Sequence, residues 1–295
     1  MEFKEELLQK TELVNNIIKG FYPKEEGLQK VIFEAMNYSI DAGGKRLRPI
    51  FMMEVSKLFD GFNKDIEPFM AALEMIHTYS LVHDDLPAMD NDDYRRGMLT
   101  THKKFGHAMG ILAGDALLNF AFETAADAVC NSNDINRAAK AMSVLGKKAG
   151  AYGMIGGQVV DVNLSGSKTT KEQLDFIYEN KTSALIEAAF VIGAILSGAN
   201  EEQINLVEKA AYNIGMAFQI QDDILDVIGD AKVIGKPVLS DEKNEKTTYV
   251  TIYGVDGAKK YVKDYTDEAI NILANVGMEN VFLNNLIISL INREK

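Results

Sequence analysis

Five aspartates fall within ten residues of the stretch HDDLPAMDNDDYRRG, and two arginines follow them directly. A second acidic cluster, QDDILD, closes the segment 204–228. If that segment is helical, Asp222 and Asp226 are i and i+4. Gln219 and Asp223 lie within about 60° of the same face, so the four side chains can point into one cavity. Carboxylates gathered in this way suit Mg²⁺, although a solvated helix edge is the blander interpretation of the cluster alone.

The first cluster follows a helical pattern in which His77, Ser80 and Asp84 fall on one stripe. Pro87 cannot continue the helical hydrogen bonds regularly, so we expect the helix to end or bulge between Asp84 and Pro87. Asp90 can then return to lie beside Asp84, which an uninterrupted helix would prevent. The sequence therefore predicts two carboxylates close together at the end of a helix.

Basic residues near both clusters supply the opposite charge. Arginine matches phosphate oxygens, and Mg²⁺ usually binds through a few carboxylates together with substrate phosphates, so acid and base together indicate a diphosphate. GGKR lacks the Ser or Thr that follows the lysine of a P-loop, and GMIGGQ does not match the dinucleotide-binding pattern. Taken singly, Lys45, Arg48 or Lys236 would more often be solvated surface. The basic residues concerned are Lys45, Arg48, Arg95, Arg96, Lys181 and Lys236.

The elements that must position these residues are helices. With five prolines, no Trp and 47% hydrophobic residues, the composition favours an all-α fold. Apolar residues recur at three- and four-residue steps over 7–18, 68–82, 116–129, 174–196 and 204–228. Turn residues separate the helices at 60–65, 131–134, 163–170 and 197–200, and Thr170 with Gln173 forms a capping box. No break resembles a domain linker, so we expect one domain over 1–295, with a long irregular segment at 229–246.

Charge and cysteine content exclude several classes of protein. The net charge is -12, so nucleic acid is not an expected partner. The single cysteine, Cys130, cannot form an internal disulfide, and MEFKEELLQK lacks the order of a signal peptide, which together favour the cytoplasm. The longest apolar run, at 188–196, falls short of the roughly 18 residues that suggest a membrane span.

Six motifs spread over nearly the whole chain resemble, in order and spacing, those of the trans-isoprenyl diphosphate synthase family, of the bacterial farnesyl diphosphate synthase type. The first aspartate motif reads DDxxxxD, with the two extra residues typical of the bacterial form, and the second reads DDxxD. No motif position departs from the family pattern. The six are GGKRLRP, HDDLPAMDNDDYRRG, GGQVVD, KTSALI, FQIQDDILD and GKP.

The resemblance implies a single-domain helical bundle around a deep apolar cavity, usually a homodimer, with an aspartate motif on each opposing wall. It implies head-to-tail prenyl transfer: an allylic diphosphate ionises, isopentenyl diphosphate attacks C1 of the cation, and the released diphosphate takes the proton. Small-molecule diphosphates are therefore the expected substrates, and farnesyl diphosphate is the expected product.

The resemblance also assigns the residues that act on the allylic diphosphate. Asp84 and Asp90 are expected to hold two Mg²⁺ ions and Asp222 a third, whereas Asp85 and Asp226 act less directly or through water. Beside the three ions, the cations expected to stabilise the departing diphosphate are Arg95, Lys181 and Lys236.

Other positions are expected to bind the second substrate, the cation and the growing chain. The isopentenyl diphosphate site comprises Lys45, Arg48, His77 and Arg96. Thr182 and Gln219 offer oxygen dipoles near the carbocation. Tyr79 stands five residues before Asp84, where an aromatic side chain is typical of C15 synthases, so Tyr79 and Ser80 are assigned to the tail cavity.

Three alternatives remain open. A geranylgeranyl diphosphate synthase would share every motif and differ in the depth of the tail cavity. A class I terpene cyclase shares the fold and the cation chemistry but lacks the isopentenyl site that GGKRLRP, His77 and the paired arginines indicate. An inactive subunit of a heteromeric synthase usually loses an aspartate motif, and both motifs are intact here.

Overall fold

The computed structural model describes residues 2–228 and 247–292. The segment 229–246, and with it Lys236, lies outside the described residues. The all-α prediction is confirmed, because the regular elements of the described residues are helices apart from one short hairpin. The elements are α1 (Phe3–Lys19), α2 (Lys30–Asp41), α3 (Leu47–Ser56), α4 (Glu67–Asp84), β1 (Tyr94–Arg95), β2 (Met98–Leu99), α5 (Thr101–Phe105), α6 (His107–Asn131), α7 (Ile135–Ala149), α8 (Met154–Leu164), α9 (Lys171–Ile177), η1 (Tyr178–Ser183), α10 (Ala184–Leu196), α11 (Glu201–Ile228), α14 (Tyr249–Leu273) and α15 (Val281–Ile291).

The chain divides into two compact units. Unit 1 comprises Met1–Met53 and Phe62–Met142, and unit 2 comprises Glu54–Gly61 and Ser143–Lys295. The chain passes from one unit to the other within α3 and again within α7. The single domain expected from the sequence stays a prediction, as does the deep apolar cavity.

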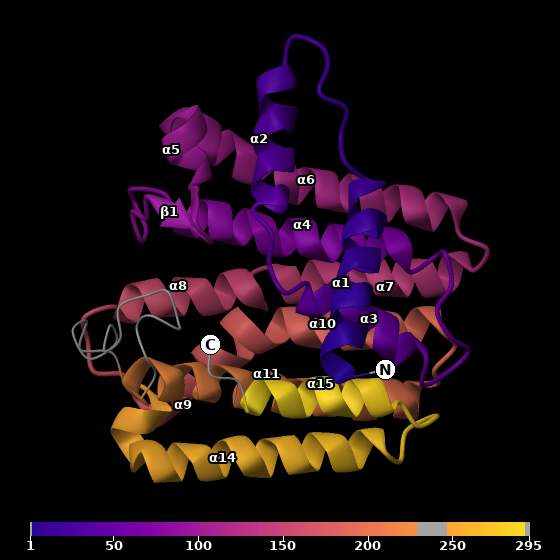
Figure 1. Cartoon of the computed structure of the whole chain (residues 1–295), viewed down its shortest axis with the longest axis vertical. Coiled ribbons are helices and arrows are strands. Elements are labelled where there is room, and N and C mark those ends of the chain that lie inside the picture. Colours follow the sequence, from indigo (N-terminus) through magenta and orange to yellow (C-terminus); the bar gives the residue numbers. More distant parts are fainter. Residues whose placement is uncertain (1, 229–246, 293–295) are drawn as a thin grey trace. The chain divides into compact units, whose positions relative to one another are not determined.

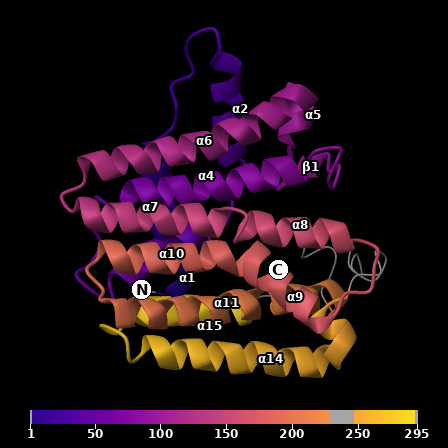
Figure 2. The same ribbon diagram turned by 180° about the vertical axis from the view of Figure 1, so that it is seen from behind.

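In unit 1, α4 lies along α6 (Figure 1 and Figure 2). Glycines allow this close approach, since a Cβ added to Gly114 of α6 would lie 2.0 Å from Nε2 of His83 on α4. Pro68 occupies the first turn of α4, where its missing N–H costs no helical hydrogen bond. The helix ends at Asp84, before Pro87, as the sequence predicts.

In unit 2, all thirteen residues of α10 are buried, and α10 and α14 both pack on α11. The predicted capping box is confirmed: the Thr170 side chain accepts from the Gln173 backbone, and the Gln173 side chain accepts from the Thr170 backbone. The pattern of 174–196 predicts one regular α-helix, whereas the structure places the six-residue π-helix η1 between α9 and α10. Apolar periodicity does not reveal such a segment, because one π turn shifts the register without interrupting the helix.

Three of the predicted breaks coincide with helix ends: α6 ends at Asn131, α8 at Leu164 and α10 at Leu196. Among the helices of residues 2–228 and 247–292, none combines the length and the apolar character that crossing a membrane requires.

Candidate active site

Unit 1 gathers guanidinium groups around a histidine. Burial lowers the pKa of His77 well below its usual value, and the charges of Arg48, Arg96, Arg46 and Arg95 lower it further. Nε of Arg48 is buried and makes no hydrogen bond within the described residues. Burial also lowers the pKa of Arg48, although Glu74 acts in the opposite direction. A neutral histidine lies among arginines, and the buried Nε–H of Arg48 has no acceptor in the described part of the chain. An anion would stabilise such a cluster.

Arg46, which has no role among the sequence predictions, anchors this cluster. Its side chain is buried and forms an ion pair of 2.6 Å with the buried Glu74 of α4. It also donates to the Asn15 side chain at 2.9 Å and to the Ile40 carbonyl at 2.7 Å. Arg46 is thus already paired within the protein. In the GGKRLRP segment, the cations that could bind an anion are therefore Arg48 and the exposed Lys45.

The two neighbouring arginines lie on the hairpin between α4 and α5. Arg95 belongs to β1, and Arg96 and Gly97 form the two-residue turn to β2, with φ of 53° and 79°. Positive φ at both positions is the type I′ pattern that matches the twist of a tight hairpin. Arg95 thus lies at the end of a strand and Arg96 in the turn, and their expected division between the two substrates stays a prediction.

Arg96 reaches the glycine pair of the first basic motif. Its Nη1 donates to the Gly43 carbonyl, and a Cβ added to Gly44 would lie 2.6 Å from the same nitrogen. Gly44 has a φ of 140°. Gly44 therefore leaves the space into which the guanidinium of Arg96 packs, and the Gly43 carbonyl accepts its hydrogen bond, so this contact connects the GGKRLRP and RRG motifs.

Arg95 is held by Asp85 rather than left open to solvent. Its Nε donates to both carboxylate oxygens, at 2.8 and 3.0 Å, and its Nη2 donates to Oδ1 at 2.6 Å. Burial raises the pKa of Asp85, although the hydrogen bonds and charge of Arg95 act in the opposite direction. For Arg95, burial acts to lower the pKa, but the hydrogen bonds and charge of Asp85 outweigh it, so the pKa of Arg95 is raised. Asp85 therefore positions Arg95, and its indirect role toward the diphosphate stays a prediction.

The backbones of Asp84 and Asp90 meet, whereas the approach of their carboxylates stays a prediction. The backbone N–H of Asp90 donates to the Asp84 carbonyl at 2.8 Å, so the chain folds back after α4. Their carboxylates are hard oxygen donors that fit Mg²⁺. Within the described residues, no group of three His, Cys, Asp or Glu side chains forms a complete cage.

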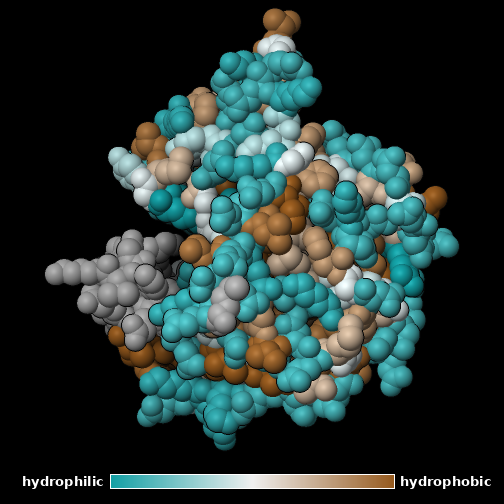
Figure 3. All heavy atoms as spheres, turned by 45° about the vertical axis from the view of Figure 1, so that its right-hand side comes forward, coloured by the Kyte–Doolittle hydropathy of each residue, from teal (hydrophilic) through white to brown (hydrophobic). Residues whose placement is uncertain are grey.

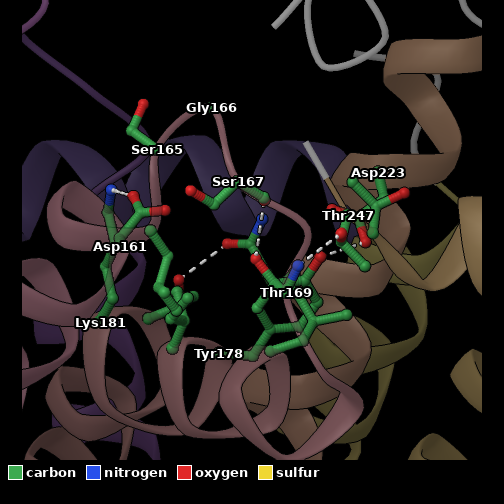
Figure 4. Close-up of a pocket in the computed structure, with 15 residues that line it drawn as sticks. Asp161, Ser165, Gly166, Ser167, Thr169, Tyr178, Lys181, Asp223 and Thr247 are labelled. Atoms are coloured by element: carbon green, nitrogen blue, oxygen red, sulfur yellow. Dashed lines mark hydrogen bonds and ion pairs between the residues drawn. The ribbon is translucent and has the colours of Figure 1, made fainter. Parts of the chain in front are cut away.

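Unit 2 contains a pocket at the junction of α8, η1 and α11 (Figure 4). Nζ of Lys181 donates to Asp161 at 2.5 Å, and Oγ1 of Thr182 donates to Oε1 of Gln219 at 2.7 Å. Together with Asp223 these side chains line the pocket, which also includes the segment 165–167 before α9. The structure thus brings together three of the predicted residues, Lys181, Thr182 and Gln219.

Asp223 differs from the sequence expectation that Gln219, Asp222, Asp223 and Asp226 share one face. It is 3% exposed, and its Oδ2 accepts from the Tyr178 hydroxyl at 2.6 Å and from the Tyr249 N–H at 3.4 Å. Asp222 and Asp226 are partly buried and do not line the pocket. The core tolerates this carboxylate because protein donors replace its water, a possibility that the sequence does not reveal.

The two positions assigned to the tail cavity behave differently. Tyr79 is 5% exposed, its ring meets the His83 ring edge-on at 5.8 Å, and its hydroxyl has no hydrogen-bond partner in the described chain. Ser80 is partly buried, and its hydroxyl donates to the His77 carbonyl at 2.9 Å. Of the two side chains, Tyr79 alone has the bulk to close a cavity.

Several residues of the site were missed by sequence reasoning. Asp161 ends the GGQVVD motif, so a signal existed, but nothing in the spacing pairs it with Lys181. Glu74 and Tyr178 lie inside apolar helical patterns and give no signal of their own. Their roles depend on partners 28 and 45 residues away, Arg46 and Asp223.

Comparisons with known proteins agree with this geometry. Residues 29–278 match the family model described as polyprenyl synthetase. A farnesyl diphosphate synthase of Micrococcus luteus is 41% identical over 292 residues, covering 99% of each chain. Large subunit 1 of the heterodimeric geranylgeranyl pyrophosphate synthase of Arabidopsis thaliana is 42% identical over 286 residues, 95% of this chain and 76% of that protein.

Solved structures show the same similarity. The crystal structure of an FPP/GFPP synthase from Zymomonas mobilis matches with a TM-score of 0.87 at 31% identity, covering 98% of each chain. A geranylgeranyl pyrophosphate synthetase from Pyrococcus horikoshii matches with a TM-score of 0.87 at 31% identity, covering 99% of each chain.

Proposed function

The chain belongs to the polyprenyl synthetase family, and we propose that it is a farnesyl diphosphate synthase. In this reaction isopentenyl diphosphate condenses head to tail, first with dimethylallyl diphosphate and then with geranyl diphosphate. The observation that carries the proposal is the cluster of arginines around the neutral His77. It provides a site for a second diphosphate, which a cyclase acting on one diphosphate does not need.

In unit 1 the isopentenyl site of the proposal comprises Lys45, Arg48, His77 and Arg96. Arg48 and Arg96 offer N–H groups that can fork onto phosphate oxygens, and Lys45 adds a positive charge. The anion would also raise the pKa of His77 and allow it to donate a second hydrogen bond. Binding energy from this diphosphate orients the double bond that attacks the allylic carbon.

On the allylic side, the proposal gives Asp84, Asp90 and Asp222 the role of Mg²⁺ ligands, with three ions when substrate is bound. When present, the ions neutralise the charge that develops on the diphosphate as its bond to the allylic carbon breaks. Arg95 and Lys181 contribute further positive charge, fixed by Asp85 and Asp161. Lys236, outside the described residues, belongs to this proposal on the resemblance alone.

The chemistry near the cation falls to two neutral groups. The Thr182 hydroxyl donates to Gln219, so an oxygen lone pair of Thr182 remains available toward the pocket. These dipoles can stabilise a developing positive charge without reacting with it. Among the described residues that line the pocket, the carboxylates of Asp161 and Asp223 accept from Lys181 and Tyr178, and in the proposal the released diphosphate takes the final proton.

Product length is supported by two observations. Tyr79 is a bulky, buried residue five positions before Asp84. The Micrococcus luteus relative is a farnesyl diphosphate synthase, although relatives at similar identity make geranylgeranyl diphosphate. The C15 product is therefore the first choice, and C20 is the second.

The test is to incubate the purified chain with Mg²⁺, dimethylallyl diphosphate and isopentenyl diphosphate, and to measure product mass after dephosphorylation. We expect farnesol as the main product. Geranylgeraniol would select the C20 alternative, and no product from any allylic primer would indicate a subunit that is inactive alone. A cyclic hydrocarbon from farnesyl diphosphate without isopentenyl diphosphate would identify a cyclase.

A homodimer is part of the proposal and is supported by the surface of unit 1. Leu28, between α1 and α2, is fully exposed, and Figure 3 shows apolar atoms at the tip of this segment. Beside it is a groove of about 590 Å³ whose apolar lining includes Phe33, Met36 and Phe120. An apolar tip next to an apolar groove can be exchanged symmetrically between two copies.

The dimer predicts a clear effect of Leu28→Asp. A charge at the apolar tip should weaken the association, so sedimentation velocity should show a larger fraction of monomer than for the unaltered chain. Leu8→Asp, at an exposed position of α1, is the matched control and should remain dimeric. Equal behaviour of both variants would remove Leu28 from the interface.

A cytoplasmic location completes the proposal, supported by the single cysteine.

A further inference from the structure

The π-helix η1 carries two residues of the proposed site, Lys181 and Thr182. A π-helical segment is rare, and its wider backbone needs support from outside the helix. Part of that support is local, because the Ser183 hydroxyl donates to the Tyr178 carbonyl at 3.1 Å. Gly157 of α8 allows the backbone of η1 to approach closely, since a Cβ added to Gly157 would lie 2.2 Å from the backbone nitrogen of Lys181.

The remaining support comes from three positions of α11 spaced four residues apart. A Cβ added to Gly215 would lie 2.6 Å from Cα of Ser183, so the two backbones nearly touch. One turn later Gln219 accepts from Thr182 at 2.7 Å. One further turn along, Asp223 accepts from Tyr178 at 2.6 Å. Residues i, i+4 and i+8 of one helix therefore hold η1 in a single register.

The contact between Tyr178 and Asp223 is the buried end of this series. Both residues are 5% exposed or less, and a hydrogen bond to a carboxylate is among the stronger ones in proteins. The ring of Tyr178 stacks on that of Tyr249, with centroids 5.7 Å apart. Asp222 directly precedes Asp223, so fixing Asp223 also fixes the direction in which α11 presents Asp222.

We propose that Tyr178 is a positioning residue: by donating to Asp223 it locks η1 onto α11, and so holds Thr182 and Lys181 in the geometry that the reaction needs. This inference rests on the proposed function. It also gives the two adjacent aspartates of the second motif different roles: Asp223 holds η1 through Tyr178, whereas Asp222 acts on the substrate in the proposed function.

Tyr178→Phe tests the proposal, because it removes one hydroxyl and keeps the ring and its stacking. We expect kcat to fall by about tenfold, as the loss of one hydrogen bond to a charged group would allow. The KM for isopentenyl diphosphate should change less than about twofold, since that substrate binds elsewhere in the proposal. In the substrate-free protein, amide hydrogen exchange should accelerate in 178–184 and not in α4.

Two further variants distinguish positioning from general packing. Tyr253→Phe removes a hydroxyl from the same aromatic group, where Tyr253 contacts the Tyr249 ring at 5.7 Å, and it should leave kcat and exchange unchanged. Asp223→Asn combined with Tyr178→Phe should lower kcat no further than the more damaging single change, because both changes remove the same hydrogen bond between Tyr178 and the carboxylate.

Each contrary result has a defined meaning. Unaltered kcat and exchange in Tyr178→Phe, equal losses in Tyr253→Phe, or multiplicative losses in the double variant would each overturn the role of Tyr178. The unaltered chain serves as the reference: if it condenses no substrates the proposed function fails, and the exchange measurement still tests whether Tyr178 fixes η1.

Discussion

Tyr79 joins a large buried ring to a hydroxyl that has no partner within the described residues. Burial and the charge of Asp84 raise the pKa of this hydroxyl to about 12, so it stays neutral. If the ring ends the tail cavity, Tyr79→Ala should shift the product toward C20 and longer, and the cavity left behind should cost about 3 kcal/mol of stability. Chromatography of the products and urea unfolding measure the two effects.

Tyr79→Phe is the matched control, because it keeps the ring and removes only the unpartnered oxygen. It should retain the C15 product and lose no stability, since a buried hydroxyl without a partner favours unfolding. A C15 product from both variants would mean that Tyr79 does not set chain length.

His77 gives the stability of the protein a specific dependence on pH. Its folded-state pKa lies well below 6.5, because burial and the surrounding arginines disfavour the imidazolium. The unfolded chain takes up a proton near pH 6.5 whereas the folded chain does not, so the free energy of unfolding should fall as the pH drops below about 6.5. His77→Gln should flatten this part of the curve, as measured by urea unfolding between pH 5 and 8.

The comparison with Gln isolates one group, because every other titrating residue is common to both proteins. An identical decline in the two curves would show that His77 is protonated in the folded state. Added inorganic pyrophosphate should bring the curves closer together, since an anion in the cluster favours the protonated form.

At this scale the sequence predicted residue types better than contacts. Aspartates, arginines and lysines of the motifs could be found because their chemistry is visible in the chain. The partners that orient them, such as Glu74 for Arg46 and Asp161 for Lys181, lie on other helices, and no spacing in the sequence pairs them. Only the packing of those helices determines which side chains meet.

Among the elements, η1 depends on the absence of a side chain at Gly157. In an open helix position Gly→Ala stabilises by roughly 0.5–1 kcal/mol. Here the added methyl would lie 2.2 Å from the backbone nitrogen of Lys181. Gly157→Ala should therefore lower the free energy of unfolding by about 1–3 kcal/mol and reduce turnover. Denaturant unfolding decides the sign, and a stabilised variant would mean that the contact is not tight.

Val159→Ala provides the control on the same helix, because Val159 is half exposed and should tolerate the change. Loss of turnover in both variants would indicate that α8 as a whole is sensitive to substitution, rather than its contact with η1.

Most helices could be predicted, since their apolar periods and terminal turn residues are local signals. The capping box at Thr170 and the end of α4 at Asp84 are confirmed for this reason. The π-helix and the hairpin of Arg95 and Arg96 could not, because neither departs from its surroundings in composition. Both lie at positions of the proposed site, where function and local preference often disagree.

For the whole molecule, the open question is whether the two units fold as one domain. The chain changes unit at 53/54, at 61/62 and at 142/143, so neither unit is continuous in sequence. Two of these points fall inside α3 and α7. Unfolding one unit alone would break both helices in mid-course and expose helical backbone groups that are now hydrogen-bonded.

We therefore expect a single cooperative transition on heating. Circular dichroism at 222 nm and near-ultraviolet tyrosine signals should give coincident curves, and the calorimetric and van't Hoff enthalpies should agree at constant protein concentration. Tyr79 in unit 1 and the tyrosines around Tyr249 in unit 2 report on different parts of the chain. Two resolved transitions, or a calorimetric enthalpy well above the van't Hoff value, would show that the units are separate domains; coincidence would support the single domain expected from the unbroken run of helices.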